Sequence, residues 1–217
     1  MRSIVLACLL FAAGLPPLAK AGPAQAERHA EPARSETRQV GAFDAIAVHA
    51  PLELTISRSQ QPSLQVSAPL AVLRTLTTTI EKGRLTIRLP DTRDTPPIRV
   101  TVATPSLRAI EITGAARVQA TDLIADTLAV ALTGSGMIAL GGQVERLAVS
   151  LGGSGVLDLA RLQARHATLD FTGSGEAHVY ASQSVQAQLS GAGRIVIAGN
   201  PKQRSVAQSG SGQIVFQ

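Results

Sequence analysis

A short glycine turn recurs through the C-terminal half of this chain at a nearly constant interval. Its copies read "ITGAA" (112–116), "LTGSG" (132–136), "LGGSG" (151–155), "FTGSG" (171–175), "LSGAG" (189–193) and "QSGSG" (208–212). The first glycines of successive copies are separated by 20, 19, 20, 18 and 19 residues. Self-similarity at such a fixed period is the signature of a solenoid, in which each repeat forms one coil.

Apolar residues recur at fixed positions when the copies are aligned on the first glycine. Four residues after it come Val118, Ile138, Leu157, Ala177, Ile195 and Ile214. Two residues before it come Ile112, Leu132, Leu151, Phe171, Leu189 and, as the one exception, Gln208. The fourth residue before and the sixth after are apolar as well, so alternate side chains of two strands face a common interior. Residues between the strands, such as 141–148, are expected to complete each coil as a third, irregular side.

The sequence therefore predicts an all-β protein, a parallel β-helix (solenoid) with GSG-turn repeats of about 19 residues over 106–217. Glycine suits a sharp corner because it reaches positive φ without a Cβ clash, and serine hydroxyls there can satisfy nearby backbone groups. Ala115 and Ala192 replace the serine in two copies, which argues against a catalytic serine. No catalytic, cofactor-binding or metal-binding residue is predicted. The glycines predicted to be structural turns are Gly114, Gly134, Gly136, Gly153, Gly155, Gly173, Gly175, Gly191, Gly193, Gly210 and Gly212.

The N-terminal half alternates apolar and polar residues in short runs, the pattern of β-strands. Residues 75–89 are predicted to form a hairpin, with Gly83 in its turn. Helix is expected only as one turn near Pro69 to Leu73. We expect the strands of 41–105 to cap the N-terminal end of the β-helix, so that 41–217 forms a single domain.

The first 26 residues have the features of a signal peptide: a basic residue, an apolar stretch, and small residues where cleavage occurs. Cleavage is predicted after Ala26 or Ala21, and a flexible leader is predicted over 27–40. A membrane span needs about 20 apolar residues, which this stretch does not supply, so no transmembrane segment is predicted for the mature chain. Cys8, the single cysteine, lies in the predicted signal peptide, so the mature chain would lack thiol chemistry. The protein is expected to be exported, to the periplasm or the cell surface.

The charge of the chain gives no indication of nucleic-acid binding. The formal net charge of +5 includes Arg2 and Lys20, which cleavage of the signal peptide would remove. The remaining basic residues are scattered along the sequence. A nucleic-acid interface usually has a basic stripe or a stacking platform of aromatic residues, and the chain has one Tyr and no Trp. No nucleic-acid partner is predicted.

Several short patterns resemble known sites of chemistry only in part. "GAGRIV" (191–196) lacks the third glycine of a dinucleotide loop, and "GGSGVLD" (152–158) places its aspartate one residue late for a calcium nonapeptide. Asp158 with His178, and Glu176 with Arg194, are expected to stack in consecutive coils as exposed ion pairs, or alternatively as an acid–base site. His49 and His166 are expected to stand alone, without metal-like spacing to a second ligand.

"GAFDAIAVHAPLELTI" (41–56), "GRLTIRL" (83–89), "IRVTVATPSLRAIEITGAARV" (98–118) and the later GSG turns resemble one known family over about 41–217. The chain is similar to the putative auto-transporter adhesin, head GIN domain family. The resemblance implies an exported bacterial protein with a right-handed β-helix-like fold. It brings no catalytic residues, and the family's name suggests adhesion.

Two classes of function are therefore predicted. The first is a non-enzymatic binding or structural module of the bacterial envelope, adhesin-like, with a protein or glycan partner whose identity is unknown. The alternative is a carbohydrate-binding or carbohydrate-active β-helix protein. Charged side chains that converge with Tyr180 in a groove would favour the sugar hypothesis, whereas polar residues spread over flat faces would favour the module.

The last repeat, 209–217, places Ile214 and Phe216 inward and then the chain stops. Natural sheets usually protect such an edge with charge, proline or a covering segment. Gln208 and Gln213 make the edge polar without blocking strand pairing. We expect self-association, or docking of a partner strand, through this C-terminal coil.

Overall fold

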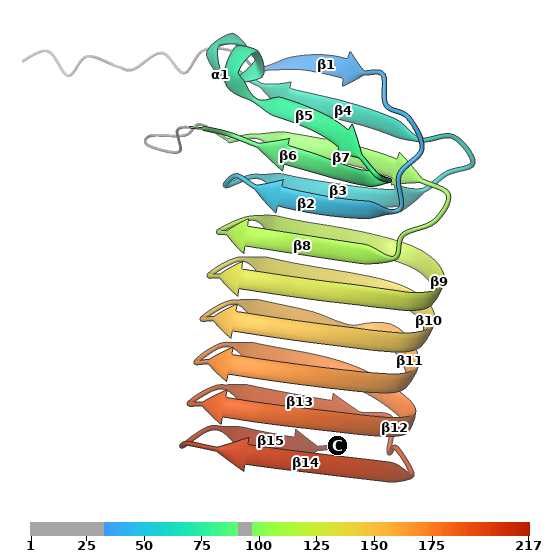
Figure 1. Ribbon diagram of the computed structural model, residues 1–217, viewed down its shortest axis with the longest axis vertical. Coiled ribbons are helices and arrows are strands. Elements are labelled where there is room, and N and C mark those ends of the chain that lie inside the picture. Colours follow the sequence, from blue (N-terminus) through green and yellow to red (C-terminus); the bar gives the residue numbers. More distant parts are fainter. Residues whose placement is uncertain (1–32, 91–96) are drawn as a thin grey trace, which may run out of the picture. The chain divides into compact units, whose positions relative to one another are not determined.

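The computed structural model describes residues 33–90 and 97–217, which belong to one compact unit, Glu31–Gln217. The predicted signal peptide, 1–26, lies outside the described residues. Four long strands form the middle of a stack of coils: β9 (Arg117–Gly134), β10 (Met137–Gly153), β11 (Val156–Gly173) and β12 (Glu176–Gly191). Each pairs in parallel with the next (Figure 1). The predicted all-β solenoid is confirmed.

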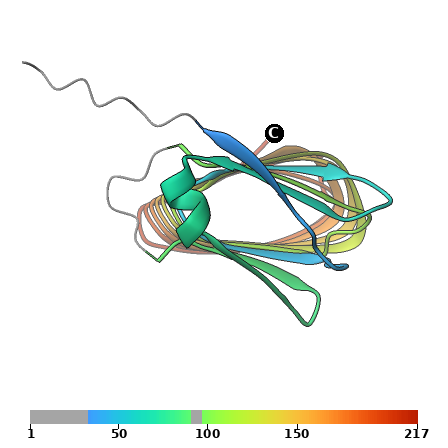
Figure 2. The ribbon, with the colours of Figure 1, turned by 90° about the horizontal axis from the view of Figure 1, so that it is seen from above.

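Each long strand bends midway, so its two halves belong to two different sheets. The coils form flattened rings when viewed along the stack (Figure 2). The first halves form the back sheet and the second halves the front sheet. Three strands end the stack: β13 (Arg194–Ala198) and β15 (Gln213–Phe216) in the back sheet, and β14 (Gln203–Ser209) in the front sheet. The expected irregular third side over 141–148 is wrong, because β10 stays extended and paired through these residues.

Strands from the N-terminal half add further coils to the same stack. They are β2 (Ala45–His49), β3 (Glu53–Arg58), β6 (Arg84–Arg88), β7 (Arg99–Thr104) and β8 (Ala109–Gly114). β2 and β3 pair in parallel with β8 and β9, and β6 and β7 pair in parallel with β2 and β3. The expectation that all of 41–105 caps the β-helix is therefore wrong in part, since these strands continue it.

The N-terminal cap is a smaller, antiparallel group of elements. β4 (Ser63–Ala68) runs antiparallel to β7, and β5 (Thr77–Glu81) runs antiparallel to β6. The helix α1 (Leu70–Thr75) connects β4 to β5 over this end of the stack (Figure 2). The predicted helical turn and the predicted hairpin are both confirmed. Lys82 and Gly83, with φ of 50° and 76°, form its two-residue turn, as type I′ geometry requires.

The expectation of a flexible leader over 27–40 is wrong for its last part. Strand β1 (Arg34–Arg38) pairs antiparallel with β4 and extends the cap by one strand (Figure 1). The sequence of β1 is polar, with no apolar alternation, so its pairing depends on backbone hydrogen bonds and on Arg38.

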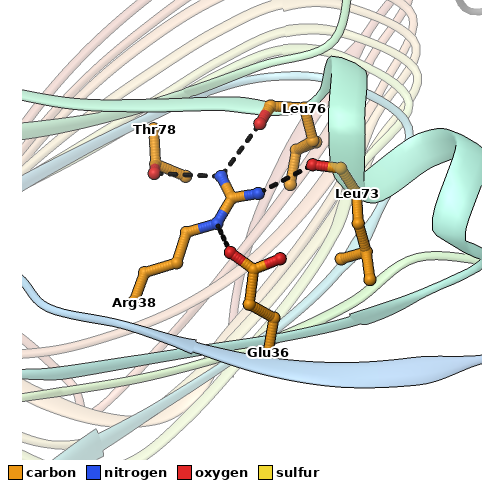
Figure 3. A network of polar contacts seen from close by, with 5 residues as sticks. All are labelled: Glu36, Arg38, Leu73, Leu76 and Thr78. Carbon is orange, nitrogen blue, oxygen red and sulfur yellow. Dashed lines mark hydrogen bonds and ion pairs between the residues drawn. The ribbon is translucent and has the colours of Figure 1, made fainter.

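Arg38 joins β1 to the end of α1 and to β5 (Figure 3). Its guanidinium donates to the carbonyl oxygens of Leu73 and Leu76, at 3.0 and 2.8 Å, and to Oγ1 of Thr78 at 3.1 Å. The carboxylate of Glu36 accepts from Nε at 3.2 Å. The last carbonyls of a helix lack partners within the helix, so this side chain satisfies groups that would otherwise depend on water. Hydrogen bonds to a charged group contribute about 1.5–3 kcal/mol each.

The first glycine has two separate reasons to be glycine in every corner except the first, where only the backbone conformation of Gly114 requires it. In all six corners its φ lies in the left-handed region, from 103° at Gly210 to 130° at Gly134. In addition, a Cβ on Gly153 would lie 2.5 Å from the carbonyl oxygen of Gly134 in the coil above. That carbonyl accepts a hydrogen bond from the backbone N–H of Ser154 at 3.0 Å. The backbones of successive corners are therefore in direct contact.

The second glycine is required by packing alone. Gly175 does not have positive φ, but a Cβ there would lie 2.5 Å from both the Gly155 carbonyl oxygen and Cδ2 of Leu151. The expected serine hydroxyl bonds are not seen in the described part of the chain: Ser154 and Ser174 contribute their backbone N–H groups instead. The corner sequence thus reflects close contact between coils.

Differences in repeat length are taken up at the bends. The corner glycines are in register from coil to coil, so Gly134, Gly153, Gly173 and Gly191 form one column. Repeats of 18 to 20 residues share this register at the corners, so their differences in length must be accommodated at another point of each coil. The register shifts all fall at the bends, the largest between Leu159 and Gln163.

The C-terminal end is closed partly by side chains, which corrects the expectation of an unprotected edge. Arg204 and Gln208 take the places that Val185 and Leu189 occupy in the coil above. Nε2 of Gln208 donates to the carbonyl oxygen of Gly212 at 2.7 Å. The Arg204 guanidinium lies 4.3 Å from the ring centroid of Phe216. β14 itself is exposed along its whole length.

Replacing Gly153 by valine should lower the free energy of unfolding by roughly 1–3 kcal/mol, because it combines a strained φ with a backbone clash. Gly114→Val is the matched comparison: its φ is 111°, but no atom lies within 4 Å of the added Cβ. We expect a smaller loss there, and almost none for Ser154→Ala. Urea denaturation measures all three, and a larger loss for the serine variant would contradict the structural role of the glycines.

If the exposed edge of β14 pairs with a second copy, sedimentation velocity of residues 27–217 should show a dimer at high concentration. Ala207→Lys places a charge on the outer face of β14 and should return the protein to the monomer. Ala148→Lys, on the same face but in a coil paired on both sides, is the control and should not. A monomeric parent protein at high concentration would show that this edge does not pair.

Candidate binding groove on the bend side

A groove of about 930 Å³ runs along the side of the stack where the long strands bend. It lies outside the core, over the bends that join the back sheet to the front sheet. Figure 1 shows these bends on the side of the stack opposite the corners. The bends contribute 124–127, 143–146, 163–165, Tyr180 and Ser182, and the N-terminal end is lined by Arg58 and 105–108. Its volume is within the range of known ligand sites, although the groove is open along its length.

The lining gathers charges that are far apart in the sequence. Four arginines, Arg58, Arg108, Arg146 and Arg165, lie in it with two carboxylates, Asp126 and Glu145. The net charge of the lining is therefore positive. The basic residues are scattered along the sequence, but the coils bring these four to one surface.

Two of the four arginines are engaged by carboxylates. Nε of Arg165 lies 3.5 Å from Oε2 of Glu145 in the coil above, and Nε of Arg108 donates to Oδ2 of Asp44 at 2.8 Å. Within residues 33–90 and 97–217, neither Arg58 nor Arg146 has an ion pair or a side-chain hydrogen bond. These two guanidinium groups can therefore take part in binding a ligand.

A column of larger side chains runs down the groove, one from each coil. Gln143 is in register with Ile124 on one side and with Gln163 on the other, and Gln163 is in register with Tyr180. The Ile124 side chain is exposed, at 59%. Tyr180 is half-buried and lies against Gly199, where a Cβ would come 3.0 Å from Cζ of the ring.

His166 does not stand alone, so that expectation is wrong. Its Nδ1 lies 2.8 Å from Oγ of Ser184, and its Nε2 lies 4.0 Å from Oε1 of Glu145 at the rim of the groove. A catalytic serine, histidine and acid would need two hydrogen bonds, one on each ring nitrogen. The distance to Glu145 is too long for the second, and both side chains are over 40% exposed.

The ion pairs predicted on the back sheet do not form between the expected partners. Asp158 is in register with His178, and Glu176 with Arg194, so the predicted stacking is correct. Nε2 of His178, however, lies 3.1 Å from Oε1 of Glu176 on its own strand. Asp158 instead accepts a hydrogen bond from the backbone N–H of Ala160 at 3.4 Å. No acid–base pair of the predicted kind is assembled among the described residues.

The predicted turn glycines lie at the corners, and none of them lines the groove. Among residues 33–90 and 97–217, no three His, Cys, Asp or Glu side chains are grouped so as to hold a metal ion. The described helix is too short to cross a membrane.

Comparison with known proteins shows the family of this chain. A family model described as "Putative auto-transporter adhesin, head GIN domain" matches residues 42–201. The chain belongs to the head GIN domain family. No curated protein matches it. The match covers all of the coils that line the groove, so the groove is part of the head GIN domain of this chain.

Solved structures share this fold at low sequence identity. A putative adhesin from Bacteroides fragilis is 20% identical, with a TM-score of 0.72 over 85% of this chain and 97% of that chain. A putative lipid binding protein from Parabacteroides distasonis is 22% identical, with a TM-score of 0.53 over 86% and 97% of the two chains. A putative adhesin from Parabacteroides merdae is 15% identical, also with a TM-score of 0.53. At these identities the likeness establishes the fold.

Proposed function

We propose that this head GIN domain protein is exported and serves as a non-enzymatic, adhesin-like binding protein of the bacterial cell envelope. The groove on the bend side would hold its ligand. The family and the solved neighbours are described as putative adhesins or lipid-binding proteins, which supports a binding role. The observation that carries the proposal is the gathering of four arginines, two carboxylates and the one tyrosine in a single open groove.

Export is supported by the signal-peptide pattern of residues 1–26. The periplasm and the cell surface are both consistent with that pattern. N-terminal sequencing of the exported protein distinguishes cleavage after Ala21 from cleavage after Ala26.

A lipid ligand, as the name of the Parabacteroides distasonis neighbour suggests for that protein, fits this chain less well. An acyl chain needs an enclosed apolar cavity. Here the space between the two sheets is occupied by buried side chains, among them Leu132, Leu151 and Phe171. The open groove outside the core is lined by charged and amide groups.

A carbohydrate-active enzyme is the second candidate, and the carboxylates of Asp126 and Glu145 in the groove are the observation in its favour. A general acid is usually a carboxyl shielded from water by apolar neighbours. The Glu145 side chain is instead 41% exposed and lies beside the Arg165 guanidinium. This environment suits binding better than proton transfer.

A glycan array and a pull-down with residues 27–217 should identify a ligand, because the groove offers a preformed polar surface. Any glycan that binds should then keep its chain length during prolonged incubation, as measured by mass spectrometry. The variants Glu145→Gln and Ser184→Ala, which remove the groove carboxylate and the hydroxyl beside His166, are incubated with the same glycan for comparison. Shortening of the glycan by the parent protein but not by these variants would contradict the non-enzymatic role. Failure to capture a glycan or a protein would contradict the binding role.

A further inference from the structure

The groove contains two guanidinium groups placed to bind anions. Arg58 and Arg146 have no ionic or side-chain hydrogen-bonded partner in the described chain, unlike Arg108 and Arg165. A guanidinium presents a planar set of donors that matches a carboxylate or sulfate group, often through two parallel hydrogen bonds. The lining as a whole is positively charged, which favours an acidic ligand.

The groove is also built for an extended chain. Ile124, Gln143, Gln163 and Tyr180 follow one another in register, one from each coil. Neighbouring coils lie about 4.8 Å apart, the spacing of paired strands. That spacing is similar to the length of one sugar ring, so successive sugars of an extended chain can meet successive coils.

The same column supplies the two kinds of contact that sugars use. The amides of Gln143 and Gln163 can donate to and accept from hydroxyl groups. The ring of Tyr180 offers an apolar face with a polar tip, and it is held against the backbone at Gly199. Gly199 has a φ of 94°, so a side chain there would be strained and would also displace the ring.

We propose that this groove binds an extended acidic polysaccharide, with Arg58 and Arg146 on its carboxylate or sulfate groups and Tyr180 against a sugar ring. The inference rests on the proposed binding function and names the ligand class. A nucleic acid fits less well, because Asp126 and Glu145 lie in the same groove as the arginines and would repel closely spaced phosphates. Toward a polysaccharide, the same carboxylates accept hydrogen bonds from hydroxyl groups.

Isothermal titration of residues 27–217 tests the proposal with tetragalacturonate, its fully methyl-esterified form and a sulfated chondroitin tetrasaccharide. At least one acidic probe should bind, and the uncharged ester should bind at least about ten-fold more weakly than tetragalacturonate if that is the ligand. Arg146→Gln should weaken acidic binding by about ten-fold, because it removes one charged contact. Arg194→Gln, an exposed arginine outside the groove, is the control and should bind like the parent.

Tyr180→Ala should also weaken binding, while Tyr180→Phe should retain it, since the ring face is the contact. Thermal melts of each variant separate loss of binding from loss of folding. The proposal is overturned if neither acidic probe binds, if the ester binds as well as the acid, or if Arg194→Gln loses as much as Arg146→Gln. Tighter, Arg146-dependent binding of a single-stranded oligonucleotide would also overturn it. If acidic probes fail while the array or pull-down finds another ligand, the binding function stands and only the ligand class is wrong.

Discussion

The structure depends on close backbone contact between successive corners. From the second corner onward, each corner donates backbone N–H groups to the carbonyls of the corner above, as Ser154 does to Gly134 and Val156 does to Gly136. This contact leaves no room for a Cβ at either glycine of these corners, and it fixes the register of the coils that carry them. The apolar side chains two residues before the first glycine, such as Leu132 and Leu151, are then placed one above the other in the core.

The groove follows from the same constraint. Because the corners are in register, repeats that differ in length can only differ at the bends, where the register shifts fall. The corner side is therefore regular and carries small side chains, whereas the bend side varies and carries long polar residues such as Arg146 and Arg165. The glycines that fix the fold and the residues that line the groove thus lie on opposite sides of each coil. The groove residues can therefore differ between proteins of this fold while the corner sequence stays the same.

The glycine period and the buried ladder were enough to predict the solenoid, its interior and the corner, because corner register is shared by all copies. The same alignment could not predict the groove. Tyr180 comes seven residues after Gly173 while Gln163 comes ten after Gly153, yet the two are register partners. The coils made by β2, β3, β6 and β7 were missed for a different reason: they carry no GSG turn, and their order in the stack differs from their order in the chain. β6 and β7 follow β2 and β3 in the sequence, but they pair with the edges of β2 and β3 that face away from β8 and β9. The role of Arg38 was missed because its partners lie 35 to 40 residues away.

Native-state hydrogen exchange at the corners tests the central claim most directly. The amide hydrogens of Ser154 and Ser174 lie in exposed turns but are bonded to the coil above. If the stacked corners hold the fold together, these amides should exchange only through global unfolding, with protection that matches the denaturant-derived stability. Rapid exchange of both amides, as in an ordinary surface loop, with the strands still protected, would contradict the claim.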